Sequence, residues 1–100
     1  MANKEIKTEQ APAAIGPYSQ GIVAGEFAYA SGQIPVDPET GEVVSDKIED
    51  QARQSLNNVK AVLEEADFSL EDVIKTTCFI ADMSDFATFN KAYSEFFTGT

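Results

Sequence analysis

Apolar residues at helical spacing between positions 46 and 66 constrain the fold more than any other feature. Ser45 or Asp46 can cap a helix there, and Glu49, three residues after Asp46, resembles a capping box. The expected apolar stripe follows 3–4 spacing and consists of Ile48, Ala52, Leu56, Val59, Leu63 and Ala66. Asp67 is expected to end the helix, because Asp tolerates a left-handed backbone better than most residues.

The remaining pattern predicts strands and a second helix. Residues 73–81 alternate with apolar side chains on both faces, which predicts a central strand. Ser84 is expected to cap a helix over 85–97, whose stripe is Phe86, Phe89, Tyr93, Phe96 and Phe97. Residues 18–23 and 27–31 predict a hairpin, and 4–9 a weak edge strand. The pattern is thus β-β-α-β-α, and two helices this apolar must lie on a sheet. A chain of 100 residues forms one domain.

The hairpin brings a first group of candidate site residues together. A two-residue loop at Ala24-Gly25 pairs Tyr18 with Ser31, whereas a three-residue loop pairs Tyr18 with Gly32. In either register the phenol lies near the Ser31-Gly32 step. The Tyr18 hydroxyl could hold water or substrate, Ser31 could donate and accept, and the Gly32 N–H could reach a carboxylate because no Cβ blocks it. The alternative, favoured by residue types alone, is a tyrosine that packs on its neighbour.

Asn90 is the second candidate, because its spacing from Phe86 and Tyr93 places it inside the aromatic stripe. A buried amide without partners costs about 1–3 kcal/mol. Either a nearby backbone group satisfies Asn90, which is the commoner case, or its amide lines a small polar pocket.

Charge and composition exclude several functions. The net charge of −10 disfavours nucleic acids and anionic lipids as partners, and the seven basic residues form no cluster. With no His and one Cys, a His-based triad, a His metal site and an internal disulfide are excluded. No apolar run approaches the ~20 residues of a membrane helix, and the N-terminus lacks a secretory apolar segment. We therefore expect a cytoplasmic protein without membrane contact.

Several blocks keep a shared order and spacing over most of the chain. They are Gly16-Pro17-Tyr18-Ser19-Gln20, Ser31-Gly32-Gln33-Ile34-Pro35, residues 51–60, Val73-Ile74-Lys75-Thr76-Thr77, residues 85–93 and Phe96-Phe97. Together they resemble the RidA (YjgF-type) family of reactive-intermediate imine deaminases.

The resemblance implies a chorismate-mutase-like α+β fold, with a mixed sheet covered on one face by two helices. It also implies a homotrimer with ligand clefts between subunits, and hydrolysis of 2-imino acids to 2-keto acids and ammonia without metal or organic cofactor. Carried onto this sequence, the cleft would be lined by Tyr18, which holds the water, together with Ser31, Gly32 and Asn90, and Phe89 would form an apolar wall.

One departure from the family pattern affects the expected site. The family continues with two strands that carry an Arg for the substrate carboxylate and a Glu that orients the water. We therefore expect residues 1–100 to be a single RidA-like domain that is truncated at its C-terminus. The only arginine, Arg53, lies off the apolar stripe of its helix and would be a poor replacement.

The function expected from the sequence is that of a 2-iminobutanoate/2-iminopropanoate deaminase, a hydrolase. One alternative is a non-catalytic trimeric module that binds small carboxylates. A ribonuclease or translation inhibitor is a weaker alternative, because the charge opposes RNA binding.

Overall fold

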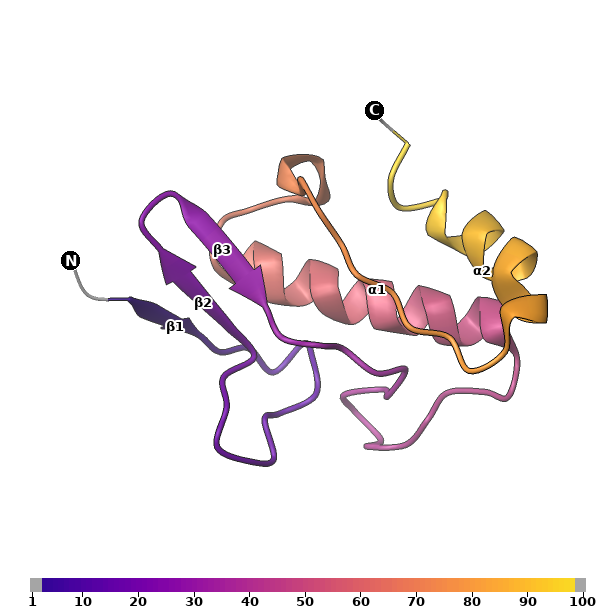
Figure 1. The fold of residues 1–100 in the computed structure, drawn as a ribbon. Helices are drawn as coiled ribbons and strands as arrows, with labels where there is room; N and C mark the ends of the chain where they lie inside the picture. Colours follow the sequence, from indigo (N-terminus) through magenta and orange to yellow (C-terminus); the bar gives the residue numbers. More distant parts are fainter. Residues whose placement is uncertain (1–2, 99–100) are drawn as a thin grey trace.

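A three-stranded antiparallel sheet lies beside one long helix in the computed structural model, which describes residues 3–98 (Figure 1). The strands, in spatial order, are β1 (Lys4–Ile6), β2 (Gly21–Ala24) and β3 (Phe27–Ala30). The helices are α1 (Ile48–Glu65) and α2 (Phe86–Tyr93), with the short 3₁₀ turns η1 (Leu70–Asp72) and η2 (Met83–Asp85) before α2. The α+β class is confirmed.

The β2–β3 hairpin has a register that neither sequence-based alternative gave. Ala24 pairs with Phe27, so the loop is Gly25-Glu26, one residue later than the predicted two-residue loop. Gly25 has a φ of 63° and occupies the first loop position, where tight hairpin turns favour glycine. The shift moves Tyr18 out of direct register with both Ser31 and Gly32.

The long helix ends as its local chemistry predicts. Asp67 has a φ of 64°, and its N–H donates to the Glu64 carbonyl at 3.0 Å. At the other end, the predicted caps do not close the helix: Lys47 is the N-cap residue and makes no side-chain cap bond. The Ser45 hydroxyl instead accepts a hydrogen bond from the Lys47 N–H at 3.0 Å.

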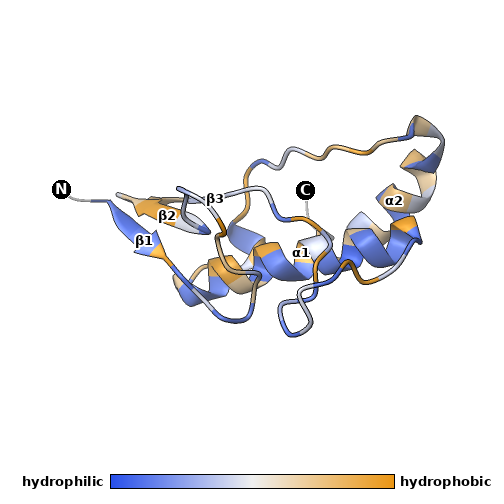
Figure 2. Cartoon of the chain, turned by 90° about the horizontal axis from the view of Figure 1, so that it is seen from below, coloured by the Kyte–Doolittle hydropathy of each residue, from blue (hydrophilic) through white to orange (hydrophobic). Residues whose placement is uncertain are grey.

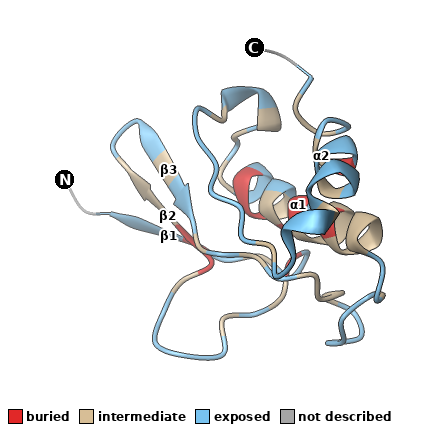
Figure 3. Cartoon of the chain, turned by 45° about the vertical axis from the view of Figure 1, so that its right-hand side comes forward, coloured by how far each residue is buried: buried red, intermediate tan, exposed pale blue. Residues whose placement is uncertain are grey.

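The core lies between the sheet and the C-terminal half of α1. Ile6, Ala11 and Val62 form its buried cluster, and Val62 is fully buried. Figure 3 shows the buried positions of α1 on the side that its neighbours cover. The buried positions of α1 are Ala52, Leu56, Asn58, Val62 and Leu63. The helix is therefore rotated relative to the predicted stripe, which contained neither Asn58 nor Val62.

The second helix packs on α1 and not on the sheet. Figures 1 and 2 both place the strands and α2 toward opposite ends of α1. The prediction that two helices cover the sheet is therefore wrong for α2. The helix is also shorter than the predicted 85–97, and its N-cap residue is Asp85, which makes no side-chain cap bond, rather than Ser84. Asp82 instead caps η2, where its side chain accepts from the Ser84 N–H at 2.9 Å.

Residues 73–81 do not form the predicted central strand. They run as an extended segment between η1 and η2, and much of it is coloured as hydrophobic in Figure 2. Ile74 and Phe79 are 85% and 92% exposed. A strand needs a neighbour for its main-chain groups, and none of residues 3–98 pairs with this segment. The sheet of the described residues is consequently antiparallel throughout, without the parallel pairing of a mixed sheet.

Candidate functional site

Ser31 joins the open end of the hairpin to the loop that precedes β2. Its N–H donates to the Gln20 carbonyl at 2.9 Å, and its hydroxyl donates to the Ser19 carbonyl at 2.5 Å. A serine hydroxyl has one proton and two lone pairs. Since the proton is used within the chain, Ser31 offers a ligand an acceptor, and not the additional donor expected from sequence.

Tyr18 is adjacent to this joint and largely open to solvent. Its side chain is 52% exposed, and its N–H donates to the Gly16 carbonyl at 2.8 Å. A Cβ on Gly16 would lie 3.6 Å from Cδ2 of the Tyr18 ring, so the ring turns back toward Gly16. The ring therefore lies beside Gly16, and about half of the residue remains open to solvent.

Gly32 presents a bare stretch of main chain beside Ser31. A Cβ at this position would meet no atom within 4 Å, and Gly32 is exposed. None of residues 3–98 accepts a hydrogen bond from its N–H. An amide of this kind can donate to a carboxylate.

The two candidates on α2 lie apart from the hairpin within one chain. Phe89 is half-buried, with its ring centroid 5.9 Å from that of Tyr93. Asn90 is exposed, so the expectation of a buried amide inside the aromatic stripe is wrong. The helix turns this position toward solvent because Ala92, and not Asn90, faces α1. The five predicted residues therefore fall into two groups. Tyr18, Ser31 and Gly32 form the hairpin group, and Phe89 and Asn90 form the α2 group.

The single arginine is already engaged by carboxylates of this chain. Its Nε and Nη2 donate to the two carboxylate oxygens of Glu95, both at 3.0 Å, and Nη1 lies 3.6 Å from Oδ1 of Asp50. The bidentate hydrogen bond lowers the pKa of the Glu95 carboxyl and raises that of Arg53. Arg53 is therefore held by carboxylates of its own chain, and it ties α1 to the turn that follows α2.

Two buried amides hold the loops around the hairpin group, and sequence reasoning missed both. Gln20 accepts from the Thr8 N–H at 2.7 Å and donates to the carbonyls of Thr8, Ala11 and Pro12 at 2.8–3.2 Å. Asn58 donates to two carbonyls of the loop that follows Gly32. For Asn58, the available signal was its position near the apolar face of the predicted helix. This position does not reveal which carbonyls the amide binds.

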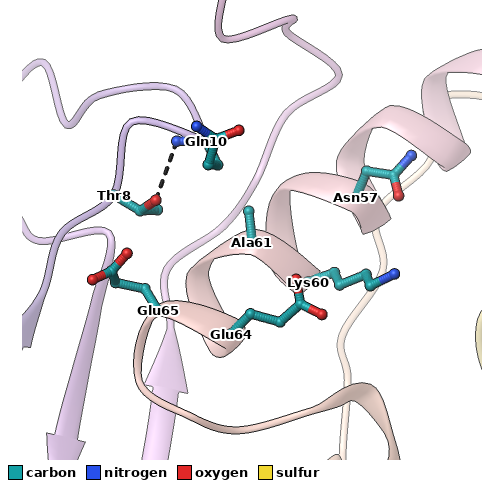
Figure 4. A pocket seen from close by; sticks show the side chains of 7 residues that line it. All are labelled: Thr8, Gln10, Asn57, Lys60, Ala61, Glu64 and Glu65. Atoms are coloured by element: carbon teal, nitrogen blue, oxygen red, sulfur yellow. Dashed lines mark hydrogen bonds between the residues drawn. The ribbon is translucent and has the colours of Figure 1, made fainter.

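Two open hollows lie elsewhere on the surface. One, of about 440 Å³, is a shallow polar depression between α1 and residues 8–10 (Figure 4). The other, of about 370 Å³, lies between residues 70–76 and the aromatic rings that follow α2. Neither is lined by any of the five predicted residues.

In the part of the chain described, no helix has the length and apolar character needed to cross a membrane.

Comparison with known proteins identifies the family. The model of the Endoribonuclease L-PSP family, which includes the RidA/YjgF proteins, matches residues 8–100. The chain belongs to this family. The resemblance inferred from the sequence blocks is thereby confirmed over nearly the whole chain.

Individual relatives in the family are similar in both sequence and structure. The 2-iminobutanoate/2-iminopropanoate deaminase of Escherichia coli K12 is 56% identical over 96 residues, which are 96% of this chain and 74% of that protein. A RutC family protein of Pyrococcus horikoshii is 58% identical over 92 residues, 92% of this chain and 73% of that one. The crystal structure of E. coli TdcF with bound serine has a TM-score of 0.91 and 54% identity, covering 95% of this chain and 74% of TdcF.

Proposed function

We propose that this RidA-family protein is a reactive-intermediate deaminase, which hydrolyses 2-iminobutanoate and 2-iminopropanoate to the 2-keto acids and ammonia. The observation that carries the proposal is the 56% identity over 96 residues with an E. coli protein that bears this name. The match includes all five candidate residues, since it spans 96% of the chain.

The reaction needs positioning more than a strong catalyst. Water adds its oxygen to the C=N carbon, and the nitrogen takes up a proton, which gives a tetrahedral carbinolamine. This intermediate loses ammonia as the C=O bond forms. An iminium carbon is already electrophilic, so the protein mainly holds a water and the substrate carboxylate in the correct geometry.

The hairpin group supplies suitable contacts for both partners. The hydroxyl of the half-exposed Tyr18 holds the attacking water. The Gly32 N–H, for which no acceptor occurs among residues 3–98, donates to the substrate carboxylate. The Ser31 hydroxyl already donates its hydrogen bond to the Ser19 carbonyl, so its oxygen accepts from the imine N–H. The binding of serine by TdcF, 54% identical to this chain, supports a cleft that takes small amino- or imino-acid-like molecules.

The cleft is shared between copies of the chain in a homotrimer. Within one chain the strands and α2 lie toward opposite ends of α1, as Figure 1 shows, which supports a cleft that takes Phe89 and Asn90 from a neighbouring copy. The site needs no metal and no organic cofactor, and the protein works in the cytoplasm.

Competition for a free imine tests the activity. A threonine dehydratase generates 2-iminobutanoate, and semicarbazide traps whatever imine remains. Added protein should lower the yield of semicarbazone and raise that of 2-ketobutanoate, in proportion to its concentration. An unchanged semicarbazone yield at every protein concentration would reject the deaminase.

Two other activities have distinct outcomes in solution. A non-catalytic binding module would bind 2-ketobutanoate without accelerating imine hydrolysis. A ribonuclease, as the family name suggests, would cleave RNA and bind it less tightly as salt is added. The net charge of −10 and the absence of histidine disfavour RNA cleavage.

A further inference from the structure

The loop that follows the Ser31-Gly32 step is not held by apolar packing. Ile34 is 64% exposed, and Val36 is only half-buried. Pro35 has no N–H, so it cannot donate a hydrogen bond to fix the loop. Within the loop, the Val36 N–H donates to the Ile34 carbonyl at 2.8 Å, and the Val44 N–H donates to the Pro35 carbonyl at 3.1 Å. Neither bond reaches α1, so another contact must hold residues 34–36 against the helix, next to the hairpin group.

That contact is the side chain of Asn58, which is 1% exposed on α1. Its Nδ2 donates both protons, to the Ile34 carbonyl at 3.1 Å and to the Val36 carbonyl at 3.0 Å. Its Oδ1 accepts from Nε2 of Gln54 at 2.8 Å. The buried amide is fully satisfied, and all three of its partners are uncharged.

Because each atom of the amide has a defined partner, Asn58 allows one orientation of the loop. Removing the donor would leave the Val36 carbonyl without this partner and the Ile34 carbonyl with the Val36 N–H alone, so the loop would lose its tie to α1. Gly32 is two residues from Ile34, and Ser31 is fixed separately through Ser19 and Gln20. A displacement of the loop would therefore change the direction of the Gly32 N–H.

We propose that Asn58 is a positioning residue for ligand binding: it anchors residues 34–36 to α1 and so aims the Gly32 amide at the substrate carboxylate. The proposal rests on the function proposed above. Asn58 does not touch the substrate, and it acts only through the main chain of the loop.

Replacing Asn58 by aspartate tests this role with little change in shape. The ionised carboxylate cannot donate to either carbonyl, whereas the protonated acid can donate to one. Burial raises the pKa of such a carboxyl, so protonation should occur in an accessible pH range. Asn57→Asp is the matched control, because it adds the same charge one residue away at an exposed position.

The measured quantity is the dissociation constant of 2-ketobutanoate, a stable product that stays ionised, between about pH 5 and pH 8. Asn58→Asp should bind about ten-fold more weakly than wild type at the upper end and recover much of this loss at the lower end. Wild type and Asn57→Asp should bind equally well at both ends. Equal, pH-independent binding by all three proteins would overturn the role of Asn58.

A second variant decides the matter if Asn58→Asp does not fold. Gln54→Met keeps the length of the side chain but removes the donor that orients the Asn58 amide. It should weaken 2-ketobutanoate binding by a few-fold, about two to five, and unchanged affinity would reject the proposal. If wild type itself neither binds 2-ketobutanoate nor hydrolyses the imine, the proposed function fails instead.

Discussion

Gly21 shows how closely the sheet and α1 approach each other. A Cβ there would lie 2.9 Å from the Tyr29 carbonyl oxygen, 2.9 Å from Cγ1 of Val62 and 3.0 Å from Cδ1 of Ile6. Since one of these atoms belongs to the backbone, the strands cannot simply move aside. Gly21→Ala should lower the free energy of unfolding by about 1–3 kcal/mol, as measured by urea denaturation.

Gly32 provides the matched control for this substitution. A Cβ there meets nothing within 4 Å, and its φ is not positive. The stability of Gly32→Ala should thus stay within about 0.5 kcal/mol of wild type. If the two alanine variants were equally stable, the close packing at Gly21 would be contradicted.

Single residues were predictable where their partners are close in sequence. The left-handed Asp67, which was expected to end the first helix, follows from local chemistry. Gln20 and Asn58 were not found, because they bind main-chain carbonyls that are 8 to 24 residues away. Any residue has a carbonyl, so no side-chain pattern identifies such partners.

At the scale of elements, the Arg53–Glu95 pair links α1 to the turn after α2. The pair lowers the pKa of Glu95, so its contribution to stability is present above the ordinary pKa of a glutamate and is lost as the pH falls through the lowered value. Glu95→Gln should therefore reduce the melting temperature slightly at neutral pH, and the difference from wild type should vanish in acid.

Glu26→Gln controls for the loss of one negative charge. Glu26 lies exposed in the hairpin loop and has no ion pair among residues 3–98. Its melting temperature should not fall below that of wild type at neutral pH. A Glu95→Gln variant that matches Glu26→Gln at every pH would show that the ion pair does not stabilise the docking of α2.

Hydrophobic periodicity predicted the long helix well, whereas the elements that depend on strand pairing were predicted poorly. The helix expected over 46–66 is α1, Ile48–Glu65, because an amphipathic stripe is a local signal. The alternation in residues 73–81 also gave a clear signal, yet no strand forms there. Alternation describes which faces are apolar, whereas a strand exists only through hydrogen bonds to another segment. The predicted two-residue hairpin loop was wrong by one residue for a related reason, because Gly25 can occupy more than one position of such a loop.

At the scale of the whole molecule, the separation of the hairpin and α2 groups predicts complementation between copies. Tyr18→Phe and Asn90→Ala each damage one half of a shared cleft. In a mixed trimer, some clefts combine an intact hairpin from one copy with an intact α2 from another. Co-refolding equal amounts should restore about a quarter of the wild-type deaminase activity.

The control is a mixture prepared without unfolding, so that the copies do not exchange. It should have only the mean activity of the two variants. If co-refolding gave the same mean, each cleft would have to be formed within a single chain, and the assignment of Phe89 and Asn90 to a neighbouring copy would be wrong.

The most direct test of the central claim is the kcat/KM for 2-iminobutanoate of Tyr18→Phe, compared with Tyr29→Phe. Tyr29 is also exposed, at 63%, but it lies on β3 outside the hairpin group, so it controls for the loss of a phenol. We predict a loss of about a hundred-fold for Tyr18→Phe and no change for Tyr29→Phe. Wild-type kcat/KM in both variants would contradict a hairpin-end site in which the Tyr18 hydroxyl holds the attacking water.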